Sequence, residues 1–218
     1  MNSLFSINGK LMHYGTKLGY LLWLQLLTVL CSLPIITAGA AFTAMHKILL
    51  QIYRDTESHI TKTFFTCFVQ NLRQATALWL LYLLYFALLV LDFLLIRQAT
   101  SVALKLAIYF LPILAIAGYL SFAWIFPLLS RYENSVLQTI KLSFTLVILR
   151  PVTTVVLAVL GLIPVALLMI TLYSFPYVVF LGITVPGLLQ ALLYSRIFDY
   201  LEDTNWRKQQ AEELIESK

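Results

Sequence analysis

The feature that most constrains this chain is a long uncharged run near its amino terminus. From Leu18 to His46 there are 29 residues without Lys, Arg, Asp or Glu. About 20 apolar residues in a helix already cross the hydrocarbon core of a bilayer, so one straight helix would be too long for this run. Pro34 and Gly39 lie inside it. Because both residue types interrupt helices, we predict a hinge between two helices here.

The composition indicates that lipid surrounds most of the chain. Of the 218 residues, 61% are hydrophobic and only 11% are charged, which leaves too little polar surface to cover a water-soluble globule. The charges gather in clusters between long apolar runs. We therefore predict an all-α fold, a polytopic transmembrane helical bundle. The net charge of +5 then reflects membrane topology, and nucleic-acid binding is not expected.

Six membrane spans are the favoured arrangement, within a transmembrane domain over residues 1–198. The lysines of residues 1–17 then share a side with the bases that follow the second span, as the positive-inside rule requires. The alternative has five spans and an amino terminus on the opposite side. It arises because residues 39–54 form a helix only about 24 Å long, and the core is roughly 30 Å thick. The predicted spans are 18–36, 39–54, 75–96, 106–130, 151–173 and 177–197.

Two polar segments with helical periodicity lie between the spans. We call them elbows, from Arg54 to Gln74 and from Arg131 to Arg150, and predict that both are amphipathic helices on the cytoplasmic membrane surface. The pattern is consistent with an internal repeat of a span, an elbow and a span. A shift of 77 residues superposes Arg54, Ser58, Leu72, Arg73 and Thr76 on Arg131, Ser135, Leu149, Arg150 and Thr153 without a gap.

Both ends of the chain carry a topology signal. Residues 199–218 hold six acids and three bases, which predicts a solvated cytoplasmic tail. Tyr173 to Tyr177, with a central proline, predict the turn between the last two spans.

The first apolar run has an alternative interpretation, a signal peptide cleaved near Ala38, Gly39 and Ala40. It is disfavoured because the hydrophobic segment of a signal peptide usually has about 7–15 residues, and this run is longer.

His46 and Lys47 are the most unusual residues of the predicted spans. An ionisable side chain at membrane depth costs about 2.5–3.5 kcal/mol on insertion scales and by default marks a function. The alternative is structural: Lys47 lies seven residues before Arg54, about 10 Å of helix rise, so its long stem can reach the interface.

Pro34, Thr37 and Gly39 join these two residues as a candidate binding or hinge site. A kinked half-helix that starts at Gly39 would direct its positive amino terminus at a small anion, and Thr37 could add a hydroxyl. The alternative is close packing between helices, because small residues four positions apart let two backbones approach.

Charged residues flank both elbows and form a second candidate surface. Their first role would be to set the topology through positive charge on the cytoplasmic side. The alternative is a docking surface for a partner, because the repeat would bring both elbows to one face. These residues are Arg54, Asp55, Arg73, Arg131 and Arg150.

The sequence contains no pattern that carries a reaction. His13, His46 and His59 lie in different segments, and Cys31 and Cys67 lack the spacing of a zinc site. Nucleophile, zinc-protease and nucleotide-binding motifs are absent. We therefore expect no catalytic residue, no metal and no cofactor, and we expect that the protein is not an enzyme.

The hinge and the first elbow resemble the YesL family of bacterial membrane proteins. The resemblance rests on LLWLQLLTVLCSLPIITAGAAFTAMHKILLQIYRD at 21–55, on QNLRQAT at 70–76 and on FPLLSRYENS at 126–135. The family is a domain of unknown function whose members are encoded beside carbohydrate ABC transporters, glycan-degrading enzymes and two-component regulators. The resemblance implies a multi-pass plasma-membrane protein and no catalytic residues.

Two functions follow as hypotheses. The first is a non-enzymatic accessory or partner in carbohydrate uptake or sensing, which would bind a carbohydrate ABC transporter or a sensor protein in the lipid bilayer. The alternative is a small-solute transporter or channel that uses the hinge. A polar cavity at Thr37, Gly39, His46 and Lys47 would favour transport, and a closed apolar bundle would favour the partner. The oligomeric state and the ligand are left open.

Overall fold

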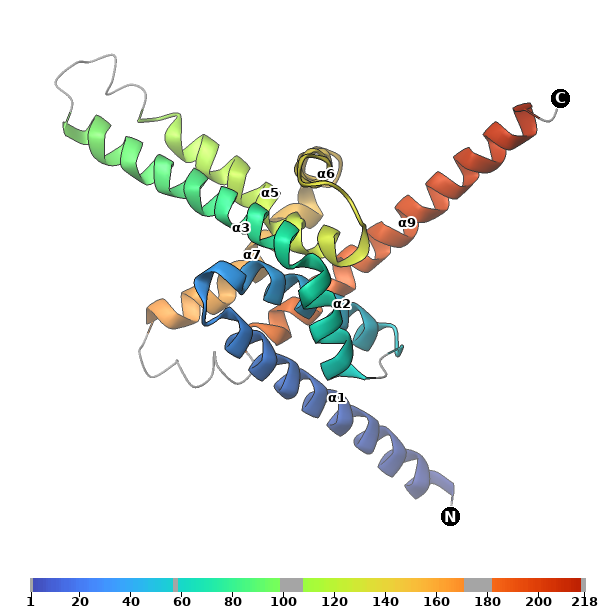
Figure 1. Ribbon diagram of the computed structural model, residues 1–218. Helices are drawn as coiled ribbons and strands as arrows, with labels where there is room; N and C mark the ends of the chain where they lie inside the picture. The colour runs from blue at the N-terminus through green and yellow to red at the C-terminus, as the bar shows by residue number, and fades with distance from the viewer. Residues whose placement is uncertain (1, 57–58, 99–107, 171–181, 217–218) are drawn as a thin grey trace.

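The computed structural model describes residues 2–56, 59–98, 108–170 and 182–216 (Figure 1). They form seven α-helices and a short 3-10 turn, and no strand occurs among them, so the predicted all-α class is confirmed. The elements are α1 (Asn2–Ser32), η1 (Ile35–Thr37), α2 (Ala38–Tyr53), α3 (Ile60–Gln98), α5 (Leu111–Arg131), α6 (Val136–Leu149), α7 (Pro151–Ile170) and α9 (Thr184–Glu216).

The predicted hinge lies where the chain turns from α1 into α2. α1 ends at Ser32, two residues before Pro34. Pro34 has an extended conformation (φ −73°, ψ 107°), because its ring fixes φ, and a proline also disfavours helix in the residue before it. η1 then leads directly into α2, so two helices replace the single long one.

α2 is the central helix, and it packs against α1, α3, α5 and α9 (Figure 1). Twelve of its 16 residues are buried. The first half carries small residues, which allow neighbouring backbones to approach, and the second half carries Met, Ile and Leu. A short helix thus holds the bundle together.

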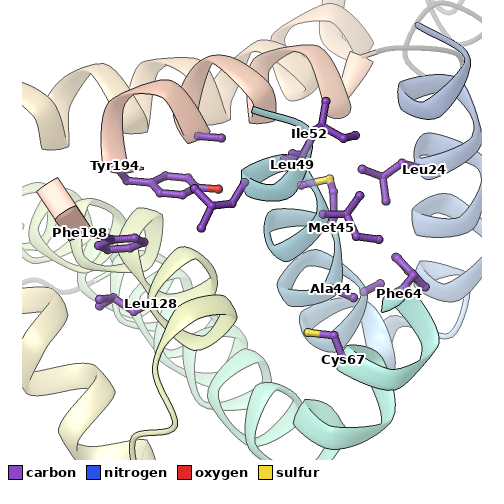
Figure 2. Close-up of a cluster of buried hydrophobic side chains, with 14 of the residues drawn as sticks. Leu24, Ala44, Met45, Leu49, Ile52, Phe64, Cys67, Leu128, Tyr194 and Phe198 are labelled. Atoms are coloured by element: carbon purple, nitrogen blue, oxygen red, sulfur yellow. The ribbon is translucent and has the colours of Figure 1, made fainter. Parts of the chain in front are cut away.

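The main hydrophobic core forms around the second half of α2. Figure 2 shows Met45, Leu49 and Ile52 of α2 among side chains from α1, α3, α5 and α9. Tyr194 and Phe198 of α9 complete this core, and their rings are 5.2 Å apart between centroids. A second cluster joins α2, α3 and α5 around Tyr82 and Phe126.

The first elbow is not a separate helix, and this corrects the prediction. α3 runs from Ile60 to Gln98 without interruption, so the elbow and the following span are one helix of 39 residues. No Pro or Gly occurs within these residues, and nothing in the sequence therefore ends the helix at Gln74. The sequence pattern changes from amphipathic to apolar along these residues, but the helix continues through the change.

The second elbow is a separate helix, as predicted. α6 is followed at once by α7, and the two helix axes meet at a bend of 112°. Arg150 at the bend has φ −132° and ψ 60°, as expected for a residue that precedes a proline. Pro151 begins α7, where its missing N–H costs nothing.

Within the described residues, three helices are long and apolar enough to cross a membrane. They are Ile35–Tyr53, Ile60–Gln98 and Leu111–Arg131, and the bent pair α6 and α7 would add a fourth. Most of the apolar surface of α3 beyond Tyr82 is exposed, as expected for a helix in lipid. The chain is thus a multi-pass membrane protein in contact with the bilayer, and the predicted count of six spans stays a prediction.

The structure changes or leaves untested some predicted boundaries. α1 is one helix from Asn2, so the predicted start at residue 18 marks a change in composition and not the start of a helix. The segment predicted as 39–54 agrees closely with α2. The predicted turn at 173–177, the start of the span 106–130 and the last two residues of the tail lie outside the described residues.

Candidate functional site

One end of the bundle gathers most of the ion pairs, and we call it the polar end. Here α2 and α5 finish, at Arg54 and Arg131, and the turn 199–202 of α9 lies beside them. Lys17 of α1 pairs with Asp55 at 2.6 Å between Nζ and Oδ1. The ends of α2 and α5, a turn of α9 and α1 therefore meet at the same end of the molecule.

Arg54 and Arg131, which the predicted repeat superposes, bind the same turn of α9. The guanidinium of Arg54 donates to the carboxylate of Asp199. Arg131 donates through Nε and Nη2 to both oxygens of Glu202, at 2.8 and 2.9 Å. A two-bond fork of this kind fixes both distance and orientation. The hydrogen-bonded Arg131 also holds the pKa of Glu202 below its ordinary value.

A third arginine also contacts this turn. The guanidinium carbon of Arg150 lies 5.1 Å from the ring centroid of Tyr200, which is the geometry of a cation–π contact. Arg150 sits at the bend between α6 and α7, so the second elbow is attached to α9 as well. The ends of α2, α5 and α6 are thereby held by one segment of α9, residues 199–202.

A polar pocket of about 910 Å³ opens at the same end. It lies between the second half of α2, the first turns of α3 and the connection from α5 to α6. Uncharged hydrogen-bonding groups form most of its lining, with a few charges among them. The residues used below are Lys47 of α2, Lys62, Thr66, Gln70 and Asn71 of α3, and Glu133 of the connection.

Lys47 enters this pocket without an internal partner. It is half-buried, and among the residues that the structure describes no hydrogen bond or ion pair involves it. By contrast, Lys17, Arg54 and Arg131 all have carboxylate partners close by. Lys47 is therefore a half-buried basic residue of the polar end whose ammonium group is available to a ligand in the pocket.

His46 faces a different space from Lys47. It lines an apolar cavity of about 390 Å³ between α2, α3, α5, α7 and α9. Its ring packs edge-on against Tyr194, with centroids 5.8 Å apart, and the Tyr194 hydroxyl lies 3.4 Å from Nδ1. The polar pocket and this cavity share no lining residue, so the two neighbours on α2 belong to separate sites.

The other residues of the predicted hinge site are used for packing. A Cβ on Gly39 would lie 2.6 Å from the carbonyl oxygen of Ala75 and 2.8 Å from Cβ of Trp79, so α2 and α3 touch there through their backbones. The Thr37 hydroxyl donates to the carbonyls of Cys31 and Pro34, at 2.8 and 2.9 Å. Pro34 itself is exposed. The structure does not bring these residues together with Lys47.

The five charged residues of the predicted docking surface differ in their surroundings. Arg54, Arg131 and Arg150 contact α9, and Asp55 pairs with Lys17. Arg73 is exposed. Sequence reasoning placed Asp199, Tyr200 and Glu202 in a solvated tail and so missed their contacts. The opposite charges of the arginines and the tail could have suggested these contacts. The partners are 145 and 71 residues apart in the sequence, however, and no sequence pattern pairs residues at such distances.

No metal site is evident in the part of the chain that the structure describes. Within the ranges given above, no group of three or more His, Cys, Asp or Glu side chains is placed to hold an ion. Both cysteines are free thiols, Cys31 half-buried in α1 and Cys67 buried in α3. The chemistry of the polar end is therefore that of charge and hydrogen bonding.

The comparisons with known proteins agree with this picture of a membrane protein. Residues 18–93 match a family described as "Protein of unknown function, DUF624". The match begins in α1, covers the hinge and α2, and ends in α3. No curated protein and no solved structure matches the chain. The resemblance to YesL is confirmed: residues 18–93 match the model of the DUF624 family of YesL-like membrane proteins, whose function is unknown.

Proposed function

We propose that this protein is a non-enzymatic accessory of another membrane complex, and that it binds its partner at the polar end. The assignment of this complex to carbohydrate uptake or sensing is taken from the resemblance to the YesL family. The observation that carries the proposal is that the two cavities beside α2 do not join into one route through the bundle. Where a transport route would follow the hinge, α2 and α3 pack directly through Gly39, and the polar pocket and the His46 cavity are separate.

The proposal includes six spans, with both termini and the polar end in the cytoplasm of a bacterium. The contacts of α1 support this arrangement. Lys17 pairs with Asp55 beyond the end of α2, and the indole of Trp23 donates to Thr61 at the start of α3 at 2.9 Å. α1 and α2 therefore form a hairpin whose hinge lies at the opposite end, and positive charge on the polar end predicts a cytoplasmic location.

The second elbow would lie at the membrane surface beside the docking surface. Leu137, Phe144 and Ile148 occupy one stripe of α6 and are 71%, 42% and 78% exposed. A different side of the helix, with Thr139 and Ser143, is buried. Because α6 is bent by 112° from the apolar α7, an exposed apolar stripe is best explained by contact with lipid at the interface.

An acidic cytoplasmic segment of a membrane protein is the partner that fits this end. Lys62, Arg73 and Lys141 are exposed there, and Lys62 also lies at the polar pocket. Exposed charges of one sign speed association with a complementary surface. The carboxylates Asp199 and Glu202 are already occupied by arginines, so they do not cancel these three bases.

Crosslinking in native membranes followed by affinity purification tests the proposal. The wild-type chain is expected to recover an ABC permease or a sensor protein. The double reversal Lys62→Glu and Arg73→Glu is expected to lose that partner. Arg97→Glu is the matched control, because Arg97 is also exposed but lies at the far end of α3. Equal recovery with both variants would contradict docking at the polar end.

The alternative, a small-solute transporter, is favoured by one observation, the polar pocket into which Lys47 opens. Reconstitution separates the two functions. Liposomes that contain this protein alone should show no uptake of labelled monosaccharides or oligosaccharides above protein-free liposomes. Uptake that is saturable and is lost in Lys47→Met would reject the accessory function and support the transporter.

A further inference from the structure

We infer that the polar pocket is a binding site for a phosphate group, with Lys47 as the cation at its inner end. The inference concerns a small ligand and does not depend on the partner protein proposed above. It rests on three observations: the unpartnered lysine, the composition of the pocket lining, and the residue that replaces Lys47 in the second copy of the repeat.

The predicted repeat places a core residue, and not a lysine, at the position that corresponds to Lys47. Shifting the chain by 77 residues places Lys47 on Trp124. Trp124 is fully buried, and its indole donates to the hydroxyl of Thr154 at 2.9 Å. The same place in a helix of the same kind can therefore be filled by an ordinary core residue. A lysine without an ion-pair partner on the most buried helix needs another explanation, and a ligand charge supplies one.

The charges around the pocket leave Lys47 as the inner cation. Arg131 also lines the pocket, but its Nε and Nη2 donate to Glu202. Lys62 is exposed on α3 and adds a second positive charge. Glu133 is the acid of the lining, and it is exposed on the connection after α5. An anion that enters would therefore lie between Lys47 and Lys62.

The uncharged lining favours a phosphate ester that also carries hydroxyl groups. The hydroxyls of Thr63 and Thr66 can donate to phosphate oxygens. The amide nitrogen of Asn71 is occupied by the carbonyl of Cys67, at 3.0 Å, so its oxygen is left as an acceptor for a ligand hydroxyl. The volume of about 910 Å³ is within the range of small-molecule sites, about 300–1,000 Å³.

A phosphate group at this end can come from a soluble metabolite or from a lipid headgroup, and the experiment separates these sources. In phospholipid-free detergent, the melting temperature of the wild type is measured with inorganic phosphate and with glycerol phosphate, against chloride at equal ionic strength. In nanodiscs, it is measured with phosphatidylglycerol against phosphatidylcholine. Each series is repeated with Lys47→Met, Lys47→Arg and the control Lys141→Met, whose lysine is exposed on α6 away from the pocket.

Phosphate or glycerol phosphate is expected to raise the melting temperature above that in chloride and to bind at least ten-fold more weakly to Lys47→Met. Lys47→Arg keeps the charge and should retain most of the affinity, and Lys141→Met should match the wild type. A Lys47-dependent effect of phosphatidylglycerol alone would assign the site to a lipid headgroup. If Lys47→Met fails to fold, Lys62→Met replaces it, with a several-fold loss expected. Absence of any effect beyond chloride, or an equal effect in these variants and the wild type, would overturn the inference.

Discussion

The two segments that a shift of 77 residues superposes, which we call the first and the second copy of the predicted repeat, end differently in the structure. In the first copy, α2 is followed by one straight helix, α3. In the second copy, α5 is followed by two helices, α6 and α7, with a bend of 112° between them. The shift superposes Arg73 on Arg150 and Thr76 on Thr153. Between them, at the bend, the first copy has Gln74 where the second has Pro151.

At this position one residue continues a helix and the other interrupts it. Gln74 continues the helix, and its side-chain amide donates to the carbonyl of Asn134 in the second copy. Pro151 removes a donor and forces the preceding residue out of the helix. The first copy therefore sends a rigid helix from the polar end into the membrane, while the second places α6 across the end of the bundle.

The packing of the first helix in each copy differs in the same way. Gly39 of α2 touches α3 through the backbone, whereas the corresponding residue of α5 is Ile116, which is 59% exposed. α2 is thus packed on most sides by other helices, whereas α5 leaves one side exposed, which we expect to contact lipid. The following predictions test these differences, from the largest expected effect to the smallest.

Of the alanine substitutions, Gly39→Ala should destabilise the protein most. Its Cβ would meet the backbone of α3 at 2.6 Å, and a backbone atom cannot turn aside as a side chain can. We expect a loss of about 1–3 kcal/mol in the free energy of unfolding, as for other overpacked sites. Thermal or denaturant unfolding in detergent measures it.

Gly19→Ala is the control for this substitution. No atom lies within 4 Å of a Cβ at Gly19, and alanine is the better helix former by roughly 0.5–1 kcal/mol. This variant should be as stable as the wild type or slightly more so. Equal stability of the two alanine variants would show that α2 and α3 are not in backbone contact.

Gln74→Pro should make the first copy resemble the second. A proline inside a helix costs about 3 kcal/mol and produces a kink. Spin labels at Thr66 and Leu88, both exposed on α3, would be about 33 Å apart along a straight helix, and their distance should shorten by several ångströms. Gln74→Ala removes the hydrogen bond to Asn134 alone and should leave the distance unchanged. A distance unaffected by the proline would refute Pro151 as the cause of the bend.

Acid should weaken the attachment of α9 through Glu202. Because Arg131 lowers the pKa of Glu202 in the folded protein, the stabilisation is complete above the unfolded pKa of about 4.3 and is lost as the pH falls through the lower folded pKa. The melting temperature of the wild type should therefore fall more steeply below about pH 4.3 than that of Glu202→Gln. Identical pH profiles of the wild type and Glu202→Gln would show that this ion pair does not stabilise the folded protein.

The two arginines that bind α9 should differ slightly in strength. Arg131 makes two hydrogen bonds to Glu202, and Arg54 makes one to Asp199. Exposed ion pairs contribute about 0–1 kcal/mol, so both methionine variants should be mild, with Arg131→Met the more destabilising. Double-mutant cycles with Asp199→Asn and Glu202→Gln measure each coupling energy. A larger coupling for Arg54 would reverse the order.

The sequence predicted the elements that depend on local chemistry. Pro34 gave the end of α1, and the bounds of α2 differ from the prediction by one residue, because a hinge and a run of small residues act over a few positions. The continuity of α3 could also have been predicted, since no Pro or Gly interrupts residues 60–98. There the change from an amphipathic to an apolar pattern was mistaken for a helix boundary.

The candidate site was predicted only in part. Lys47 and His46 stand out because they are ionisable residues in an apolar run, and that signal is local. Their separation into two sites follows from the angle of about 100° between successive helical residues. The remainder of the polar end depends on contacts between distant segments, such as Arg131 with Glu202, for which one sequence holds no periodic signal.

Cysteine accessibility tests most directly the central claim that the polar end lies on one side of the membrane, in the cytoplasm. With Cys31 and Cys67 replaced by alanine, single cysteines are placed at Thr16, Glu133 and Asp203. In intact cells a membrane-impermeant maleimide should label none of the three, and in inside-out vesicles it should label all of them. Labelling of position 16 in intact cells, with 133 and 203 protected, would contradict the account and support five spans.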